Sequence, residues 1–203
     1  MPYLTSTDVK SYGAIPSTDT QDNAELVLLI ARAQSFIEEY TGRVFMASSD
    51  TESTRYYEYS RDVEGLTLYL DADLNELGSN GIVAGTDSIV STNFYYEPRN
   101  DKPYYGITLR GNSGVSWTDS TSDGNFENAI QVHAQWAYSS DVPADIQHAL
   151  IRLVKWYYKQ GRVTDDTADR PIVLESGATV LPAEIPSDVL AILKKYVYRP
   201  VES

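Results

Sequence analysis

The sequence predicts an α+β protein, a small helical bundle with an antiparallel β-rich insertion between its first and second helices. Two long segments, residues 22–41 and 143–160, repeat apolar side chains at three- and four-residue steps. Residues 43–140 between them hold short aromatic and β-branched segments separated by turn residues. A short third helix is expected at residues 186–198. We expect residues 1–203 to form one domain, since a length of 203 residues suits one domain or one domain with a large insertion.

The first helix has clear signals at both ends. Asp22 is expected to cap its start, with Glu25 three positions later in a capping-box arrangement. Gly42 stands where a left-handed residue ends a helix. The apolar stripe between them consists of Leu26, Leu29, Ile30, Ala33, Ile37 and Tyr40.

The β-rich segment follows the alternation expected of half-buried strands. Strands are predicted at residues 54–60, 66–71, 91–98, 105–111 and 129–138. "LGSNG" (77–81) and "DSTSDGN" (119–125) are interpreted as turns between strands. In the last strand, one face is expected to carry Ile130, Val132, Ala134 and Trp136, and the other Gln131, His133 and Gln135.

The second half of the chain is expected to hold a helix, an arm and a last helix. Pro143 fits the first position of the second helix, whose predicted apolar stripe is Ile146, Ala149, Leu150, Leu153, Val154 and Tyr157. Residues 162–185 form a long polar stretch, which indicates an extended arm, a hairpin or a mobile loop. The last helix is expected to bury Val189, Ile192, Leu193 and Tyr196 on one face.

The composition limits the classes of partner and compartment. The formal charge is −13, so the protein lacks the overall basic surface of a duplex-DNA binder. The chain has no cysteine, which excludes disulfides and thiolate metal sites. No apolar run has the length of about 18 residues that a membrane span needs, and residues 1–13 lack a signal-peptide pattern. We therefore expect synthesis in a cytoplasm and no membrane partner.

Residue patterns for catalysis are weak throughout. His133 and His148 lack the spacing of a metal-ligand pair and are interpreted as structural, surface or half-buried histidines. There is no nucleophile elbow and no glycine-rich nucleotide loop. A calcium site near Asp71 and Asp73, or a hydrolase with paired carboxylates, remains an alternative. We expect no enzymatic activity, no cofactor and no catalytic or metal-binding residues.

Three segments resemble signatures of the head–tail connector proteins of tailed phages, also called adaptor or head-completion proteins. "IARAQSFIEEYTGRVF" (30–45) is similar to their first helix, which runs into Y-T-G-R-x-F. "VHAQWAYSSDVPADIQHALIRLVKWYYKQ" (132–160) is similar to their strand, V-P-x-D-I turn and helix. "IPSDVLAILKKYVYRP" (185–200) is similar to their ending, with Tyr196 or Tyr198 and Arg199 standing for a Tyr-Arg pair.

The resemblance implies a structural virion protein without catalysis. Such adaptors form a ring, commonly of twelve subunits, under the portal; the ring extends the DNA channel and provides a docking surface for tail or neck proteins. DNA would pass without specific binding, and the acidic surface agrees with that. The location expected is the head–tail neck of the virion. The alternatives are another neck or tail subunit of the tail-terminator kind and a carbohydrate-binding or hydrolytic virion protein.

Candidate contacts to other subunits or the portal follow from cations and aromatic residues on the helices. Arg43 is expected to pair with Glu38, Glu39 or a neighbouring subunit, and Phe45 to anchor the turn in the core. Surplus apolar residues such as Val27 and Leu28 are expected to pack on neighbours, and the arm to order on assembly. The candidate interface residues are Arg43, Arg152, Lys155, Trp156, Lys159, Lys194, Lys195, Tyr196 and Arg199.

Overall fold

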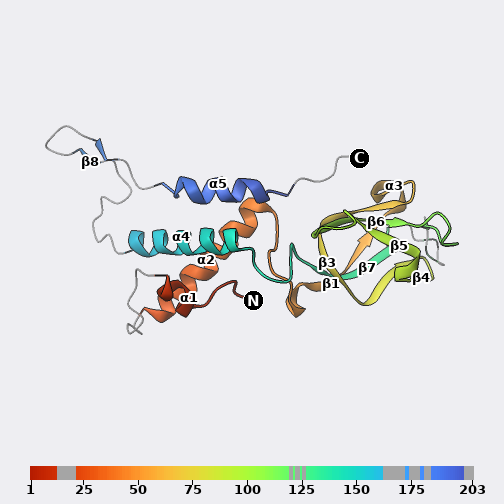
Figure 1. Cartoon of the computed structure of the whole chain (residues 1–203), viewed down its shortest axis with the longest axis horizontal. Coiled ribbons are helices and arrows are strands. Elements are labelled where there is room, and N and C mark those ends of the chain that lie inside the picture. Colours follow the sequence, from red (N-terminus) through yellow and green to blue (C-terminus); the bar gives the residue numbers. More distant parts are fainter. Residues whose placement is uncertain are drawn as a thin grey trace. The chain divides into compact units, whose positions relative to one another are not determined.

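The computed structural model describes residues 1–12, 22–118, 121, 124, 127–161, 172–173, 179–180 and 184–198 of the 203-residue chain. The fold is α+β, with a large antiparallel sheet and several helices. It divides into two compact units, which are described separately (Figure 1). The helical unit comprises Pro2–Gly42 and Pro143–Val197, and the sheet unit comprises Arg43–Val142 with Met1 and Tyr198.

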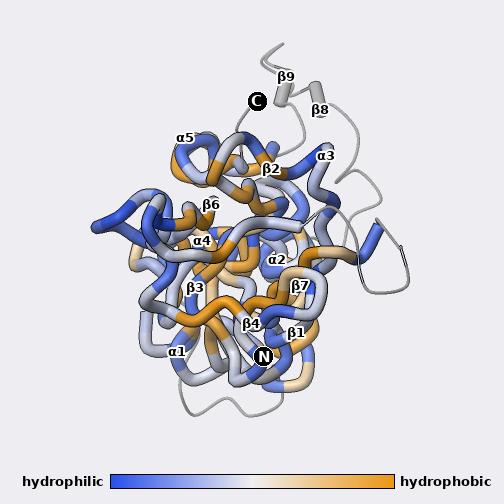
Figure 2. The backbone as a smooth tube through the Cα atoms, turned by 90° about the vertical axis from the view of Figure 1, so that its right-hand side faces the viewer, coloured by the Kyte–Doolittle hydropathy of each residue, from blue (hydrophilic) through white to orange (hydrophobic). Residues whose placement is uncertain are grey.

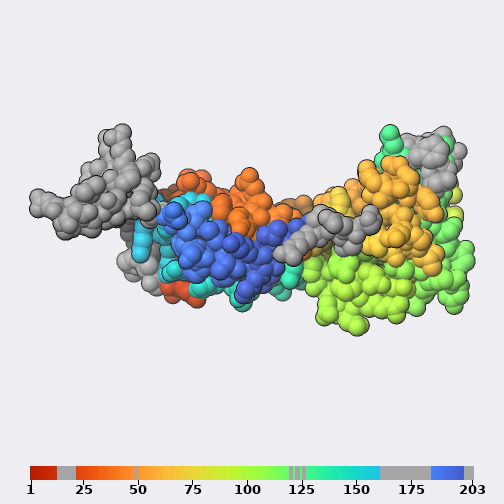
Figure 3. All heavy atoms as spheres, turned by 90° about the horizontal axis from the view of Figure 1, so that it is seen from above, coloured from red at the N-terminus to blue at the C-terminus, as the bar shows by residue number. Residues whose placement is uncertain are grey.

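The helical unit contains α1 (Ser6–Ser11), α2 (Asn23–Thr41), α4 (Ala144–Gly161) and α5 (Ser187–Tyr196). Helix α2 packs on α1, α4 and α5, and α4 packs on α5. Figure 3 shows the blue atoms of α5 lying against the orange atoms of α2. Helices α2, α4 and α5 are therefore packed together, although the sheet-forming residues separate α2 from α4 and α5 in sequence.

Helix α2 ends as its sequence predicts but begins differently. Gly42 has a left-handed φ of 67°, and its N–H donates to the Glu38 carbonyl at 2.8 Å. Asp22 occupies the N-cap position, but its side chain makes no capping hydrogen bond. The Asp22 carboxylate instead accepts a hydrogen bond from the Tyr158 hydroxyl on α4. The expected capping box is therefore wrong, because a tertiary contact to α4 engages the side chain that would form it.

The buried faces of the helices agree with the predicted stripes. All six predicted residues of α4 are buried. In α2, Leu29 and Tyr40 are half-buried rather than buried, and so are Ile192 and Tyr196 in α5. The fully or nearly fully buried members of the other two stripes are Leu26, Ile30, Ala33, Ile37, Val189 and Leu193.

The short helix α1 was not among the predicted elements. Thr5 and Asp8 form a reciprocal capping box at its start, with the Thr5 hydroxyl donating to the Asp8 carboxylate at 2.6 Å. This interaction lowers the pKa of Asp8 below its ordinary value. With six residues, α1 is too short for a periodic apolar signal, so only its cap residues could have predicted it.

The sheet unit is built around one antiparallel sheet of seven strands. Its main path runs β1–β7–β3–β6–β5, and β2 and β4 both pair with β3. A short helix, α3 (Tyr59–Asp62), precedes β2, and two 3-10 turns lie at Ser49–Thr51 and Ser91–Asn93. The strands are β1 (Glu52–Tyr57), β2 (Val63–Glu64), β3 (Thr67–Ala84), β4 (Asp87–Ile89), β5 (Phe94–Glu97), β6 (Tyr104–Leu109) and β7 (Ile130–Trp136).

Strand β3 is much longer than the sequence predicts. The "LGSNG" segment, interpreted as a turn, lies inside β3, which spans 18 residues. The register against β7 shifts between Leu77 and Ile82, so the small residues form an irregularity within the strand. Glycine and asparagine signal a local departure from ideal pairing, and sequence cannot distinguish a bulge from a turn. Likewise, Tyr59 and Ser60, expected in a strand, belong to α3.

The core of the sheet unit lies on the alternating apolar face of its strands. Strand β7 shows the predicted alternation, with Ile130, Val132, Ala134 and Trp136 buried and the residues between them half-buried. The Trp136 and Trp117 indoles, buried in this core, donate to the carbonyls of Ser53 and Leu66. Figure 2 shows orange, hydrophobic segments beside the labels of β3, β4 and β7.

Parts of the predicted arm and one predicted turn lie outside the described residues. Within residues 162–185, the structure describes β8 (Ile172–Val173) and β9 (Thr179–Val180), which pair antiparallel, as well as residues 184–185. The "DSTSDGN" segment is described only at residues 121 and 124. Among the described residues, no helix combines the length and apolarity that crossing a bilayer requires.

Candidate assembly surfaces

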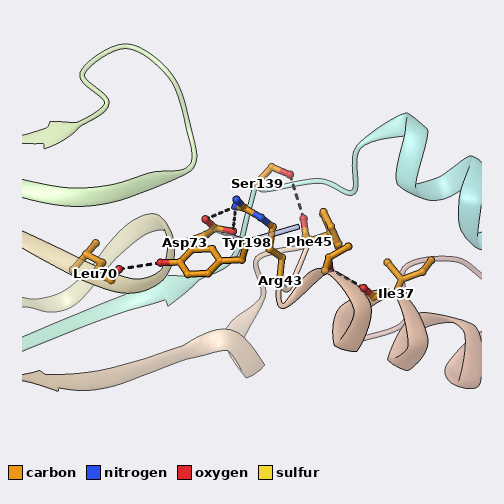
Figure 4. Close-up of polar contacts among 8 residues, drawn as sticks. Ile37, Arg43, Phe45, Leu70, Asp73, Ser139 and Tyr198 are labelled. Atoms are coloured by element: carbon orange, nitrogen blue, oxygen red, sulfur yellow. Dashed lines mark hydrogen bonds and ion pairs between the residues drawn. The ribbon is translucent and has the colours of Figure 1, made fainter. Parts of the chain in front are cut away.

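Arg43, the basic residue of the first signature, forms an ion pair inside the sheet unit. Its Nη1 lies 2.6 Å and 2.5 Å from the two carboxylate oxygens of Asp73 (Figure 4). The side chains are 16% and 6% exposed, so this pair is largely removed from water. The sequence proposes Glu38, Glu39 or a neighbouring subunit as the partner, whereas the ion pair joins Arg43 to a residue on β3.

Two tyrosine rings complete the surroundings of the Arg43 guanidinium. Its central carbon lies 5.4 Å from the ring centroid of Tyr138 and 5.1 Å from that of Tyr198. The Tyr198 hydroxyl donates to the Leu70 carbonyl at 3.0 Å (Figure 4). Tyr138, which follows β7, and Tyr198, which follows α5, therefore both contact the guanidinium of Arg43.

Burial controls the protonation of this cluster. It raises the pKa of Asp73 above its ordinary value, while the charge and hydrogen bonds of Arg43 oppose the rise. The pKa of Tyr198 is also raised, first by burial and then by the charges of Asp73 and Asp71. The ion pair with Arg43 therefore favours the charged form of Asp73, whereas its burial favours the neutral form.

Phe45, the last residue of the first signature, is fully buried, which confirms its predicted role as a core anchor. Its ring lies 5.7 Å from that of Tyr138, and its carbonyl accepts from the Ser139 hydroxyl. The neighbouring backbone adds hydrogen bonds from Ala47 N–H to the Ser139 carbonyl and from Tyr138 N–H to the Val44 carbonyl. The segment after Gly42 thus pairs with the segment after β7.

The carboxylates considered as calcium ligands contact protein groups. Asp71 accepts hydrogen bonds from Arg55 at 2.8 Å and from the Tyr57 hydroxyl at 2.7 Å, and Asp73 binds Arg43. In the part of the chain that the structure describes, no three His, Asp or Glu side chains are grouped as a metal site.

The two histidines are both half-buried, as predicted. His133 lies between Thr54 and Glu52, at 2.9 Å from the Thr54 hydroxyl and 3.0 Å from a Glu52 carboxylate oxygen. His148 packs its ring edge against Tyr12, with the ring centroids 6.1 Å apart. Each histidine therefore connects neighbouring elements of its own unit.

Two of the candidate interface cations on α4 bind other elements of the helical unit. Arg152 forms a pair of hydrogen bonds to Asp188 at the start of α5, at 2.9 Å and 3.2 Å. That pairing lowers the pKa of Asp188. Lys155 donates to the Tyr12 carbonyl at 2.9 Å and lies over the Tyr12 ring. These two cations tie α4 to α5 and to the end of α1.

The remaining candidates occupy different positions. Trp156 is half-buried and packs on Tyr157, with ring centroids 5.0 Å apart, and Tyr196 is half-buried at the end of α5. Arg199 lies outside the described residues. The last three candidates are exposed lysines, and none of them forms an ion pair with another described residue. They are Lys159, Lys194 and Lys195.

Helix α2 carries a second apolar stripe opposite its buried one. Val27 is 57% exposed and Leu28 71% exposed, although both are large and apolar. At 100° per residue, the exposed uncharged residues of this stripe fall on one side of the helix; they are Ala24, Val27, Leu28, Ala31 and Ser35. An uncharged outward face on an amphipathic helix is typical of a surface that packs on another protein.

Sequence reasoning named Asp73 and Tyr198 for other reasons and did not predict that both contact Arg43. Asp73 is 30 residues from Arg43, and its role as an ion-pair partner depends on the register of β3. Tyr198 is 128 residues from Leu70, whose carbonyl it binds. The alternative match of Tyr198 and Arg199 to the family ending was the one signal in the sequence that singled out Tyr198.

The fold itself is similar to that of chains in solved structures of gene transfer agent particles. A chain titled "Neck of empty GTA particle computed with C6 symmetry" matches with a TM-score of 0.56 and 14% identity, covering 99% of this chain and 91% of that one. A chain of the "Virion of native gene transfer agent (GTA) particle" matches with a TM-score of 0.50, 14% identity and the same coverages of 99% and 91%. At this identity the likeness establishes a shared fold.

The family follows from the sequence itself. The model of the head completion protein family matches residues 3–199, nearly the whole chain. The chain therefore belongs to the head completion protein family, which confirms the resemblance found in its three signature segments. Its role is structural and serves the completion of the head. No curated protein matches the chain in a direct comparison.

Proposed function

We propose that this protein is a non-enzymatic adaptor that forms a ring at the head–tail neck of a phage-like virion. The ring lies beneath the portal, extends the DNA channel and gives tail or neck proteins a docking surface. The observation that carries the proposal is the family match along residues 3–199. The likeness in fold to a protein in the neck of a gene transfer agent particle supports it further.

A ring requires each subunit to present two surfaces to its neighbours, and α2 offers one of them. Its exposed stripe around Val27 and Leu28 is uncharged and apolar, so packing it on a neighbour removes hydrophobic surface from water. We propose twelve subunits, the number that the resemblance implies. The C6 symmetry of the similar neck is compatible with twelve, because a twelve-membered ring also contains a six-fold axis.

In this proposal the predicted segments act as one adaptor domain. The helices at residues 22–41 and 143–160, with the C-terminal helix, form the bundle that builds the wall of the ring. The arm at residues 162–185 orders when neighbours assemble. Lys159, Lys194 and Lys195, exposed in the helical unit, contact acidic surfaces of the portal or of adjacent subunits.

The acidic charge suits a channel through which DNA moves. A net charge of −13 disfavours phosphate binding at long range, so DNA can pass without adhering to the wall. This part of the proposal needs no base-specific contact and no cofactor.

The test is assembly on the cognate portal. The purified protein is mixed with the portal ring and analysed by sedimentation and by electron micrographs. We expect a complex with a ring of adaptor density on one face of the portal. A monomer alone does not contradict the proposal, since assembly can depend on the portal, but absence of a complex with the portal would overturn it.

A further inference from the structure

The sheet unit contains a hollow that carries positive charge in an otherwise acidic segment. Its volume is about 400 Å³, within the range of about 300–1,000 Å³ that ligand sites occupy. It lies along β5, and we call it the Arg99–Arg110 hollow. The residues that line it are Ser91, Phe94, Tyr95, Tyr96, Arg99, Asn100 and Arg110.

The two arginines of the hollow share one aromatic ring. The Arg99 guanidinium lies 3.8 Å from the ring centroid of Tyr95, and the Arg110 guanidinium lies 6.0 Å from it. Arg110 N–H donates to the carbonyl of Asn93, the residue before β5, and Arg99 follows the end of that strand. Two cations from different segments therefore lie near the Tyr95 ring on β5.

These two guanidiniums differ from the other arginines of the sheet unit. Residues 43–140 hold 14 acidic and 6 basic side chains, so carboxylates are abundant. Arg43, Arg55 and Arg61 each form an ion pair with an aspartate. Neither Arg99 nor Arg110 pairs with a carboxylate of any described residue, and both side chains are exposed. Paired guanidiniums beside an aromatic ring and an amide are suited to bind carboxylates.

The chain itself supplies a complementary segment. "TDDTAD" (164–169) has three carboxylates within five residues and no cation. No other window of five residues in the sequence has as many acidic side chains. It lies in the predicted arm and begins three residues after Gly161, where α4 ends.

We propose that the Arg99–Arg110 hollow binds the acidic segment 164–169 of a neighbouring copy of this chain. Asp165, Asp166 and Asp169 supply the carboxylates, and Arg99 and Arg110 receive them over the Tyr95 ring. The contact rests on the proposed ring, which brings copies side by side. The arm of one subunit would then bind the hollow of the next subunit. Although both subunits are acidic, opposite charges would attract each other at this contact.

The absence of cysteine makes the contact testable by crosslinking. One full-length variant carries Asn100→Cys in the hollow, and another carries Thr167→Cys in the arm, so both arginines and all three aspartates are kept. The two are mixed on the portal and oxidised. We expect a disulfide-linked pair on a non-reducing gel, and at least ten-fold less of it when Arg99→Gln and Arg110→Gln are added. Arg61→Gln with Lys102→Gln removes the same charge from the same unit and is expected to leave the yield unchanged.

The outcomes separate this contact from the proposed function. If wild-type rings form on the portal and no mixed disulfide appears, the docking proposal is wrong and the adaptor function stands. If no ring forms, the adaptor function fails, and a mixed disulfide in the free protein would still support the contact. A disulfide that forms within one doubly substituted chain, at concentrations where the chains are monomeric, would overturn docking on a neighbour. A further outcome is that no disulfide forms in the mixture, while the protein binds a single-stranded oligonucleotide and the arginine variants do not. The docking proposal would then be wrong, and the ligand of the hollow would be nucleic acid.

Discussion

Arg43 and Asp73 form a largely buried ion pair that joins the residue after α2 to strand β3. Removing one partner leaves the other as a buried, uncompensated charge. We expect Asp73→Ala to lower the free energy of unfolding of the sheet unit by about 3–5 kcal/mol. The double variant Arg43→Met, Asp73→Leu is expected to lose much less, because it removes both charges. Urea unfolding of the wild type, Asp73→Ala and the double variant measures the difference.

Arg61, which is exposed and pairs with the half-buried Asp62, provides the control. Arg61 is 69% exposed, so Arg61→Ala is expected to change the free energy of unfolding by less than about 1 kcal/mol. If Asp73→Ala costs no more than Arg61→Ala, the Arg43 cluster does not stabilise the unit in the way its burial indicates.

Tyr198 contacts other residues of the sheet unit through its hydroxyl and its ring. Tyr198→Phe removes the hydrogen bond to the Leu70 carbonyl and is expected to cost about 0.5–1.5 kcal/mol in unfolding free energy. Tyr198→Ala also removes the ring beside Arg43 and is expected to cost more. Tyr105→Phe, at an exposed tyrosine, is the control and should have no measurable effect. Equal unfolding curves for wild type and Tyr198→Ala would contradict the predicted contribution.

Gly78 allows a close approach between β3 and the His133 side chain. A Cβ at this position would lie 2.4 Å from His133 Cδ2 and 2.6 Å from Glu52 Oε1. We expect Gly78→Ala to displace the ring from Glu52 and to destabilise the sheet unit by about 1–3 kcal/mol. Gly111→Ala, where a Cβ meets nothing within 4 Å, is the matched control. Thermal unfolding compares the two, and the same midpoint for both variants would show that the space at Gly78 is not required.

The buried faces of helices and strands could be predicted from the local spacing of apolar residues. Features that depend on how the strands pair could not be predicted in this way. The buried face of α4 and the alternation of β7 follow from the spacing of apolar residues, and both were predicted. The extent of β3 was missed because "LGSNG" has turn composition, while its pairing with β7 is set by tertiary structure. The same register brings Asp73 to Arg43. Arg99 and Arg110 were not singled out, because a pair of cations near one tyrosine is visible only once β5 and β6 are paired.

The ion pair between Arg152 and Asp188 makes the joining of α4 and α5 dependent on pH. Arg152 lowers the pKa of Asp188 in the folded protein. A group with a lowered pKa contributes stability above its unfolded value, about 3.9 for aspartate, and loses that contribution as the pH falls through the folded value. We expect Asp188→Asn to be slightly less stable than wild type at pH 7. The difference should vanish in the acid range below the folded pKa.

Urea unfolding of both proteins at a series of pH values measures this loss. The contribution is expected to be small, because the two side chains are 48% and 46% exposed and water screens their attraction. A difference between wild type and Asp188→Asn that stays constant from neutral to acid pH would contradict the assignment to this ion pair.

Leu28 tests the exposed stripe of α2 as a subunit surface. Its side chain is 71% exposed, so Leu28→Asp is expected to change the stability of the free subunit by no more than about 0.5 kcal/mol. In a ring contact, the same substitution places a charge in an apolar interface, where burial without a partner is strongly unfavourable. We therefore expect loss of rings in electron micrographs of the protein with its portal, with unchanged thermal unfolding of the subunit. Leu66→Asp, at an exposed leucine of the sheet unit, should still assemble. Rings of normal appearance with Leu28→Asp would exclude this face of α2 from the contact between subunits.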